Sequence, residues 1–259
     1  MTLAVHAVGD GRPMLWQHGL CGDARQTAEV FPGRIGWWGL TMECRGHGGS
    51  DAGPLGDLGF GSFARDLAAF IEERVGGPVV LGGISMGAAL ALRLAVKRPD
   101  LVSGLVLARP AWVCEAAPAN MAPYALVGEL LARHEPGEAR KVFEDTATAR
   151  QLAEVAPDNL ASLRGFFERE PIEVTRALLA QVAGDDPGVR PEDLRRLRLP
   201  TLVIGHGRDL AHPLAHAEML AGLIPGARLV RITPKAVRRD AYVADFRNAL
   251  AQCLQEIPA

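Results

Sequence analysis

The chain alternates short apolar runs with helical patterns, and this alternation restricts the fold more than any other feature. Helical patterns at Ser62–Val75, Met86–Lys97, Pro213–Leu223 and Ala241–Leu254 lie between or after the apolar runs, with Ser62 as the expected N-cap of the first. The pattern predicts an α/β fold, a mostly parallel open sheet flanked by helices. The predicted strands are Met14–His18, Leu40–Glu43, Pro78–Gly82, Gly104–Ala108, Thr201–Gly205 and Ala227–Thr233.

The alternation is interrupted in the middle of the chain. Residues 113–190 contain six prolines and helical patterns such as Ala125–Arg133 and Ile172–Val182, without a convincing strand. We therefore expect a core formed by residues 1–112 and 191–259, with residues 113–190 inserted as a helical cap over the strand ends.

Composition narrows the possible partners. The 259 residues are 48% apolar, with a formal net charge of −2 and a pI near 6.4, which argues against a nucleic-acid partner. No apolar run has the roughly 18 residues that a membrane span needs, and the first residues do not resemble a secretory signal. Four cysteines without CxxC spacing indicate reduced thiols. These features predict a cytoplasmic protein without a membrane partner. They do not indicate an oligomeric state.

The strongest local signal is Gly83-Ile84-Ser85-Met86-Gly87, which follows an apolar strand and precedes a helix. A serine on a sharp strand-to-helix turn has a crowded backbone, so small residues are needed beside it. The turn directs the hydroxyl out of the sheet, next to the positive end of the helix. The motif therefore points to Ser85 as a nucleophile.

Three further segments follow predicted strands. His18-Gly19-Leu20-Cys21-Gly22 ends the first strand, and His18 either fixes this loop or contacts a substrate. In the segment 43–51, Arg45 and His47 are expected to hold a compact turn through buried hydrogen bonds. Gly207-Arg208-Asp209 places an acid after a strand, where it orients a base or caps a helix.

With these motifs in place, the chain resembles the α/β-hydrolase superfamily, in particular its single-cap branch of small esterases and related C–C and amide hydrolases. The segments HGLCG, RGHGGSD, GISMG and GRDLAHP occur in the order typical of that branch. The resemblance implies that Ser85 is the nucleophile, that the amides of Leu20 and Met86 form an oxyanion hole, and that Asp209 is the acid. It also implies a small-molecule acyl substrate between sheet and cap, where Arg109 and Trp112 are candidate contacts.

The base of the family is missing. Val237 occupies the position after the last strand where the branch has a histidine, and no histidine follows His216. We predict that His212 replaces it, because it lies three residues after Asp209 and its unperturbed pKa near 6.5 suits a base. Pro213 would fix the backbone there and begin a helix. His206 and Lys235 are the alternatives.

The sequence thus favours an enzyme that cleaves or transfers an acyl group of an ester, thioester, lactone or amide through an acyl-Ser85 intermediate. An acyltransferase with the same intermediate, or a degraded member that binds a small ligand, are the alternative functions. We expect no cofactor and no metal. His206, His212 and His216 are close in sequence but lack an HExxH pattern, and no P-loop is present.

Overall fold

The computed structural model describes residues 1–33 and 35–257. Within them the chain forms a seven-stranded sheet in the order β1-β3-β2-β4-β5-β6-β7. Strand β1 runs antiparallel to β3 and the remaining pairs are parallel. The strands are β1 (Val5–Gly9), β2 (Arg12–Gln17), β3 (Trp37–Met42), β4 (Val79–Ile84), β5 (Val102–Ala108), β6 (Thr201–Gly205) and β7 (Arg228–Arg231).

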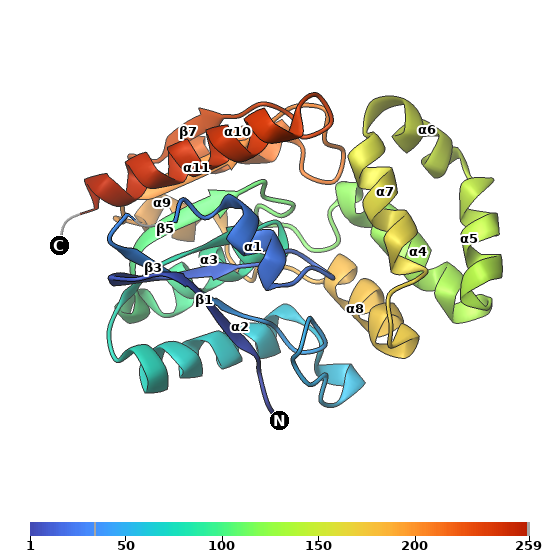
Figure 1. Cartoon of the computed structure of the whole chain (residues 1–259), viewed down its shortest axis with the longest axis horizontal. Helices are drawn as coiled ribbons and strands as arrows, with labels where there is room; N and C mark the ends of the chain where they lie inside the picture. The colour runs from blue at the N-terminus through green and yellow to red at the C-terminus, as the bar shows by residue number, and fades with distance from the viewer. Residues whose placement is uncertain (34, 258–259) are drawn as a thin grey trace.

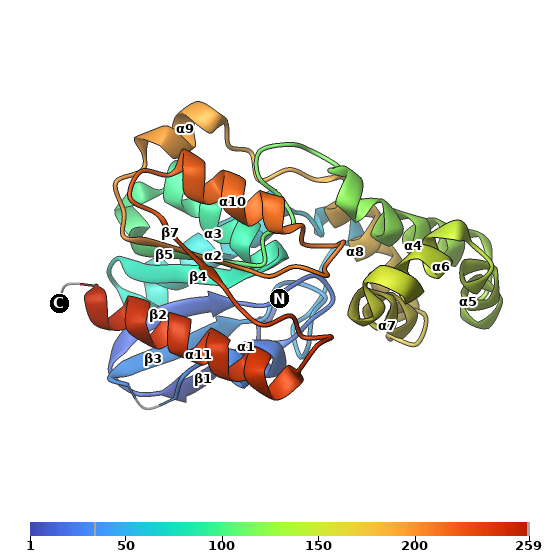
Figure 2. The same cartoon turned by 90° about the horizontal axis from the view of Figure 1, so that it is seen from above.

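Helices cover both faces of this sheet (Figures 1 and 2). Short 3₁₀ turns at Leu55–Asp57, Pro99–Leu101 and Ala119–Met121 and a π-helical turn at Ile71–Val75 complete the described elements. The α-helices are α1 (Ala24–Val30), α2 (Phe60–Phe70), α3 (Met86–Lys97), α4 (Ala122–Arg133), α5 (Pro136–Glu144), α6 (Ala147–Val155), α7 (Pro157–Phe166), α8 (Ile172–Gly184), α9 (Pro191–Arg196), α10 (Leu214–Leu223) and α11 (Arg239–Glu256).

Two apolar clusters hold the layers together. On one face, Trp16 of β2 packs edge-on against Phe246 of α11, with ring centroids 6.0 Å apart. On the other face, α2, α3 and α10 bury side chains such as Phe63 and Leu90. The second cluster continues into the helices α4–α8, so the inserted segment shares a core with the sheet layer.

The predicted fold class is confirmed, and all six predicted strands are present, Thr201–Gly205 with the predicted bounds and the others with ends shifted by a few residues. The edge strand Val5–Gly9 was not predicted, because its outward side chains leave it mostly exposed and it lacks a continuous apolar run. Helices are present at both predicted positions in the insertion, and the described residues 113–190 contain no strand.

The predicted N-cap Ser62 is wrong. The helix α2 begins at Phe60, whose backbone N–H donates to the Asp185 carboxylate at 2.6 Å, and Ser62 lies buried within the first turn. Asp185 follows α8, 125 residues later in the sequence, so local sequence could not show this partner.

The parallel register brings the functional loops to one edge of the sheet. Gln17 of β2 pairs with Gly83 of β4, and Gly83 pairs with Leu107 of β5. The loops that follow β2, β4, β5 and β6 therefore emerge side by side at the carboxyl ends of the strands, where open α/β sheets commonly bind ligands. The helices α4–α8 lie beyond this edge (Figure 2).

We predict that Gly87→Ala destabilises the fold by about 1–3 kcal/mol, since overpacking costs this much in a close-packed core. A methyl group at position 87 would lie 2.5 Å from the Gln17 carbonyl oxygen, which belongs to a fixed strand. Urea unfolding measures the effect. The matched control is Gly137→Ala at an exposed position of α5, where the methyl group would meet no atom within 4 Å. Alanine there should stabilise the helix by up to about 1 kcal/mol. Equal stability of the two variants would contradict the prediction.

Candidate functional site

Ser85 lies on a strained turn between β4 and α3. Its backbone has φ 58° and ψ −110°, which residues with a Cβ rarely adopt. The turn is held on both sides: Ser85 N–H donates to Ala108 O at 3.0 Å, and Ser85 O accepts from Ala88 N–H at 3.0 Å. Gly83 and Gly87 touch, because a methyl group on Gly83 would lie 2.5 Å from the Gly87 carbonyl carbon. The sequence therefore needs glycine on both sides of Ser85.

The loop after β2 passes directly beside this turn. A methyl group on Gly19 would lie 3.4 Å from Ser85 Cβ. The loop is fixed by Gly19 N–H donating to Gln26 Oε1 at 2.7 Å and Cys21 N–H donating to His47 Nε2 at 3.0 Å. Leu20 lies between these two anchors. Met86 begins α3, and the first N–H groups of a helix have no partner within the helix.

His18 fixes the loop. Its Nδ1–H donates to Gly19 O at 2.8 Å and its Nε2 accepts from Cys44 N–H at 3.1 Å, so both ring nitrogens are used. Burial lowers the pKa of His18 below its ordinary value, which keeps the ring neutral. The ring is fully buried, and the expected substrate contact is not found, because His18 does not line the pocket described below.

The segment after β3 forms the compact turn predicted from its sequence. His47 Nδ1–H donates to Arg45 O at 2.9 Å, and the Arg45 guanidinium donates to both oxygens of Asp66 at 2.6 and 2.8 Å. The buried Glu43 carboxylate accepts from Ala24 N–H at 2.9 Å and from Gly49 N–H at 2.7 Å. This turn therefore supports the loop that carries Leu20, and residues 43–51 do not line the pocket described below.

Asp209, in the loop after β6, is a buried carboxylate with several donors. Arg109 Nε and Nη2 donate to its Oδ2 at 3.0 and 2.7 Å, and Asn159 Nδ2 donates to its Oδ1 at 2.9 Å. Burial by itself would raise the pKa of Asp209. The Arg109 cation and His212 outweigh it and hold that pKa well below its usual range. Asp209 is therefore ionised at neutral pH.

His212 is bound to this carboxylate. Its Nδ1 lies 2.9 and 3.0 Å from the two Asp209 oxygens, and its backbone N–H donates to Oδ1 at 3.1 Å. Because an ionised carboxylate only accepts, we assign the proton to Nδ1, which leaves a lone pair on Nε2. Burial is the main cause that lowers the pKa of His212. The Asp209 carboxylate raises this pKa, whereas the Arg109 cation, whose Nη2 lies 3.1 Å from Nδ1, lowers it further.

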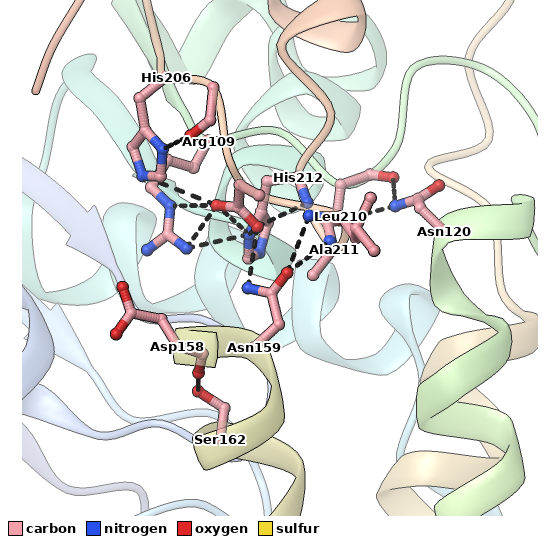
Figure 3. A network of polar contacts seen from close by, with 12 residues as sticks. Arg109, Asn120, Asp158, Asn159, Ser162, His206, Leu210, Ala211 and His212 are labelled. Carbon is pink, nitrogen blue, oxygen red and sulfur yellow. Dashed lines mark hydrogen bonds and ion pairs between the residues drawn. The ribbon is translucent and has the colours of Figure 1, made fainter. Parts of the chain in front are cut away.

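Asn159 of α7 was not recognised in the sequence. Its side-chain oxygen accepts from the N–H groups of Leu210 and Ala211 at 2.8 and 3.0 Å, while its amide donates to Asp209 (Figure 3). A single asparagine in a helical segment gives no sequence signal. Its role depends on a contact across 50 residues of chain.

A pocket of about 230 Å³ joins the predicted residues Ser85, Leu20, Arg109 and His212 with Lys235. The inserted helices form its other wall. The lining is Gly19, Leu20, Cys21, Gly22, Gln26, Ile84, Ser85, Arg109, His212 and Lys235 from the sheet layer, and Tyr124, Asp158, Asn159, Ser162 and Phe166 from α4 and α7. A larger pocket of about 480 Å³, between α1 and the strands β1 and β3, contains none of the predicted site residues.

Two of the predicted substrate contacts have other partners. Trp112 is buried outside the pocket lining, donates from Nε1 to Asp185 O at 3.1 Å, and packs edge-on against Phe60. It therefore serves the core and not the pocket. Arg109 does line the pocket, but its guanidinium is bound to Asp209.

The alternatives to His212 differ in position. His206 donates from Nδ1 to Gly207 O at 2.7 Å, and its Nε2 lies 3.7 Å from Asp209 Oδ2. His206 does not line the pocket. Val237, at the usual base position, is 57% exposed, whereas Lys235 of the same turn lines the pocket.

Among residues 1–33 and 35–257, no group of three or more His, Cys, Asp or Glu side chains is arranged to hold a metal ion. The helices described there are too short or too polar to cross a bilayer.

Comparison with known proteins identifies the family. The model of the alpha/beta hydrolase family matches residues 5–237, so the chain belongs to that family. It is 29% identical over 173 residues to the sn-1-specific diacylglycerol lipase ABHD11 of Mus musculus, an alignment that covers 62% of this chain and 52% of the mouse protein. It is 30% identical over 96 residues to homoserine O-acetyltransferase of Thermobifida fusca, covering 37% and 25% of the two chains. The aligned parts thus span about half or less of these relatives.

Solved structures share the fold. The enol-lactonase of Burkholderia xenovorans LB400 superposes with a TM-score of 0.70 and 22% identity, over 98% of this chain and 96% of that chain. This likeness shows the α/β-hydrolase fold that the sequence predicts.

We predict that Asp209→Asn destabilises the protein by about 3–5 kcal/mol, because it leaves the buried Arg109 cation without its counter-ion. The folded-state pKa of Asp209 lies below its usual value, so its contribution is present at neutral pH and is lost as the pH falls below about 4. Urea unfolding at pH 7 and at a series of pH values below 4 measures both effects. In the control Asp100→Asn, which removes an exposed partner of Arg98, little change is expected. An Asp209→Asn variant as stable as that control at pH 7 would contradict the ion-pair argument.

Proposed function

We propose that this chain hydrolyses esters or related acyl compounds through an acyl-Ser85 intermediate. One observation carries the proposal: Ser85, on its strained turn, opens into the same pocket as His212, whose other ring nitrogen is held by Asp209. A nucleophile, a base and an acid that orients the base are the parts that activate a serine hydroxyl.

The proposed reaction has two stages. Ser85 Oγ attacks the substrate carbonyl while His212 Nε2 takes its proton, and the Leu20 and Met86 amides stabilise the oxyanion. His212 then gives the proton to the leaving group, which departs and leaves the acyl-enzyme. Water attacks this ester while His212 takes its proton. His212 then gives the proton to Ser85 Oγ as the acyl–oxygen bond breaks, and the carboxylic acid leaves. Each oxyanion donor contributes about 3–4 kcal/mol in comparable sites.

The Arg109 cation affects the charge of both Asp209 and His212. Its cation neutralises Asp209 and lies within 3.1 Å of His212 Nδ1, so it opposes the imidazolium that forms when His212 takes the proton. His212 is consequently a weaker base than a histidine beside an unpaired aspartate. It remains neutral, and therefore competent, at lower pH.

The inserted helices act as a cap in this proposal. Tyr124 and Phe166 close the pocket with aromatic side chains, and Asn159 ties the cap to the acid. A volume of about 230 Å³ lies below the range of about 300–1,000 Å³ typical of drug-sized ligands, so the acyl group should be small.

Acyl transfer is the second candidate function, and the similarity to a homoserine O-acetyltransferase favours it. The same acyl-enzyme would then be resolved by an alcohol acceptor in place of water. Product analysis with and without an added acceptor separates the two reactions.

The nucleophile is tested with a fluorophosphonate probe followed by peptide mapping. We expect one labelled serine, Ser85, and loss of labelling in Ser85→Ala. Ser162 is the matched control because it lines the same pocket, and Ser162→Ala should keep the label. Labelling that persists in Ser85→Ala would reject the assignment. A correctly folded wild type that takes no label would favour a degraded, ligand-binding member of the family.

The base is tested by single-turnover acylation of Ser85. His212→Ala should slow acylation by about 10²–10⁴-fold, the usual contribution of general-base catalysis. His206→Ala should have a much smaller effect, since His206 lies outside the pocket lining.

The pH dependence of acylation gives a second readout. Because the pKa of His212 is lowered, wild-type acylation should persist below pH 6.5 and decline only as His212 becomes protonated. Replacing Arg109 by Met removes a cause of that lowering, so the decline should move to higher pH. Parent-rate acylation in His212→Ala would reject His212 as the base.

A further inference from the structure

Lys235 occupies a fixed position at the pocket. It lies in the turn after β7, where Asp245 Oδ2 accepts from Thr233 N–H at 2.9 Å and from Thr233 Oγ1 at 2.6 Å. The turn closes with Val237 N–H donating to Pro234 O at 3.0 Å. The backbone that carries Lys235 is thus held at both ends, and its side chain lines the pocket that contains Ser85.

The Lys235 ammonium has no carboxylate within ion-pair distance, 4.0 Å, anywhere in residues 1–33 and 35–257. The other cation of the pocket, Arg109, is bound to Asp209. Lys235 is only partly exposed, and a charge withdrawn from water is costly unless it gains a partner. The pocket therefore offers one positive charge that no residue of the described chain neutralises.

Asp158 carries a negative charge in the same pocket, and its carboxylate lies beyond ion-pair distance of the Lys235 ammonium. It is half-buried and lies in the first turn of α7, where the helix dipole favours a carboxylate. The α7 dipole thus stabilises the charge of Asp158, whereas no such local partner stabilises the charge of Lys235. Asp158 also disfavours a second negative charge, so the pocket suits a monoanion better than a dianion.

We propose that Lys235 selects acyl substrates that carry a carboxylate, a class narrower than the esters of the proposed function on which this inference rests. The carboxylate binds the ammonium while the scissile carbonyl lies at Ser85. The small pocket limits the spacer between the two groups to a few carbon atoms. A carboxylate also forms a stronger, charge-assisted hydrogen bond than a neutral acceptor does.

The test compares two substrates of equal shape, mono-4-nitrophenyl glutarate and its neutral isostere 4-nitrophenyl glutaramate. Uncatalysed hydrolysis is subtracted, because the free carboxylate attacks its own ester. Wild type should have the higher kcat/KM for the anion. In Lys235→Met the ratio of the two kcat/KM values should fall by about 10-fold or more, mainly through KM, and Lys235→Arg should restore part of it. Salt should lower the wild-type ratio.

Asp158→Asn is the control of opposite sign. It removes a negative charge from the same pocket, so the preference for the anion should increase. An unchanged ratio in Lys235→Met would overturn the inference. An equal loss of kcat/KM for both substrates in Lys235→Met would also overturn the inference, because Lys235 would then act in the reaction itself or in stabilising the fold.

Labelling of Ser85 with an uncharged fluorophosphonate separates this inference from the proposed function. Normal labelling without any preference for the anion rejects only the role of Lys235. Wild type that neither labels nor turns over either ester rejects the proposed function, and the inference with it.

Discussion

The buried carboxylate of Asp209 is the interaction on which the site depends. It joins three segments that are far apart in the chain: Arg109 after β5, Asn159 in α7, and its own loop through His212. An ionised group with 1% of its side chain exposed is tolerated only because each of these donors compensates for lost water. The same contacts fix the inserted helices to the sheet and orient the imidazole. Stability and the geometry of the proposed base therefore have one origin.

The second constraint on the site is the steric crowding around the backbone of Ser85. The backbone of Ser85 is held in a conformation that favours glycine, and the surrounding strands leave no space for a side chain at Gly83 or Gly87. Such strain persists where the surrounding structure determines it and is often found at functional sites. The loop of Leu20 is fixed independently by Gln26 and by the neutral, buried rings of His18 and His47. The two proposed oxyanion donors thus belong to segments whose positions are set before any substrate binds.

Arg109 shows what the tertiary structure adds to a sequence interpretation. The sequence made Arg109 a candidate substrate contact, and the structure places it in the pocket lining. Its guanidinium is paired with Asp209, which lies 100 positions later in the chain. Trp112 was the other candidate, and it is buried against Phe60 and Asp185. The partner of each side chain depends on which elements pack around it, and the local sequence does not show this.

By itself the sequence determined the alternation of strands and helices, the tight turn at Ser85 and the inserted helices, because hydrophobic period and glycine requirements are local properties. It also showed that the usual base histidine is absent. Only the tertiary structure decided which remaining groups share the pocket. It placed His212 and Lys235 there, left His206 outside its lining, and recruited Asn159 from α7. Those choices depend on contacts between distant segments, and such contacts are set by the packing of the helices on the sheet.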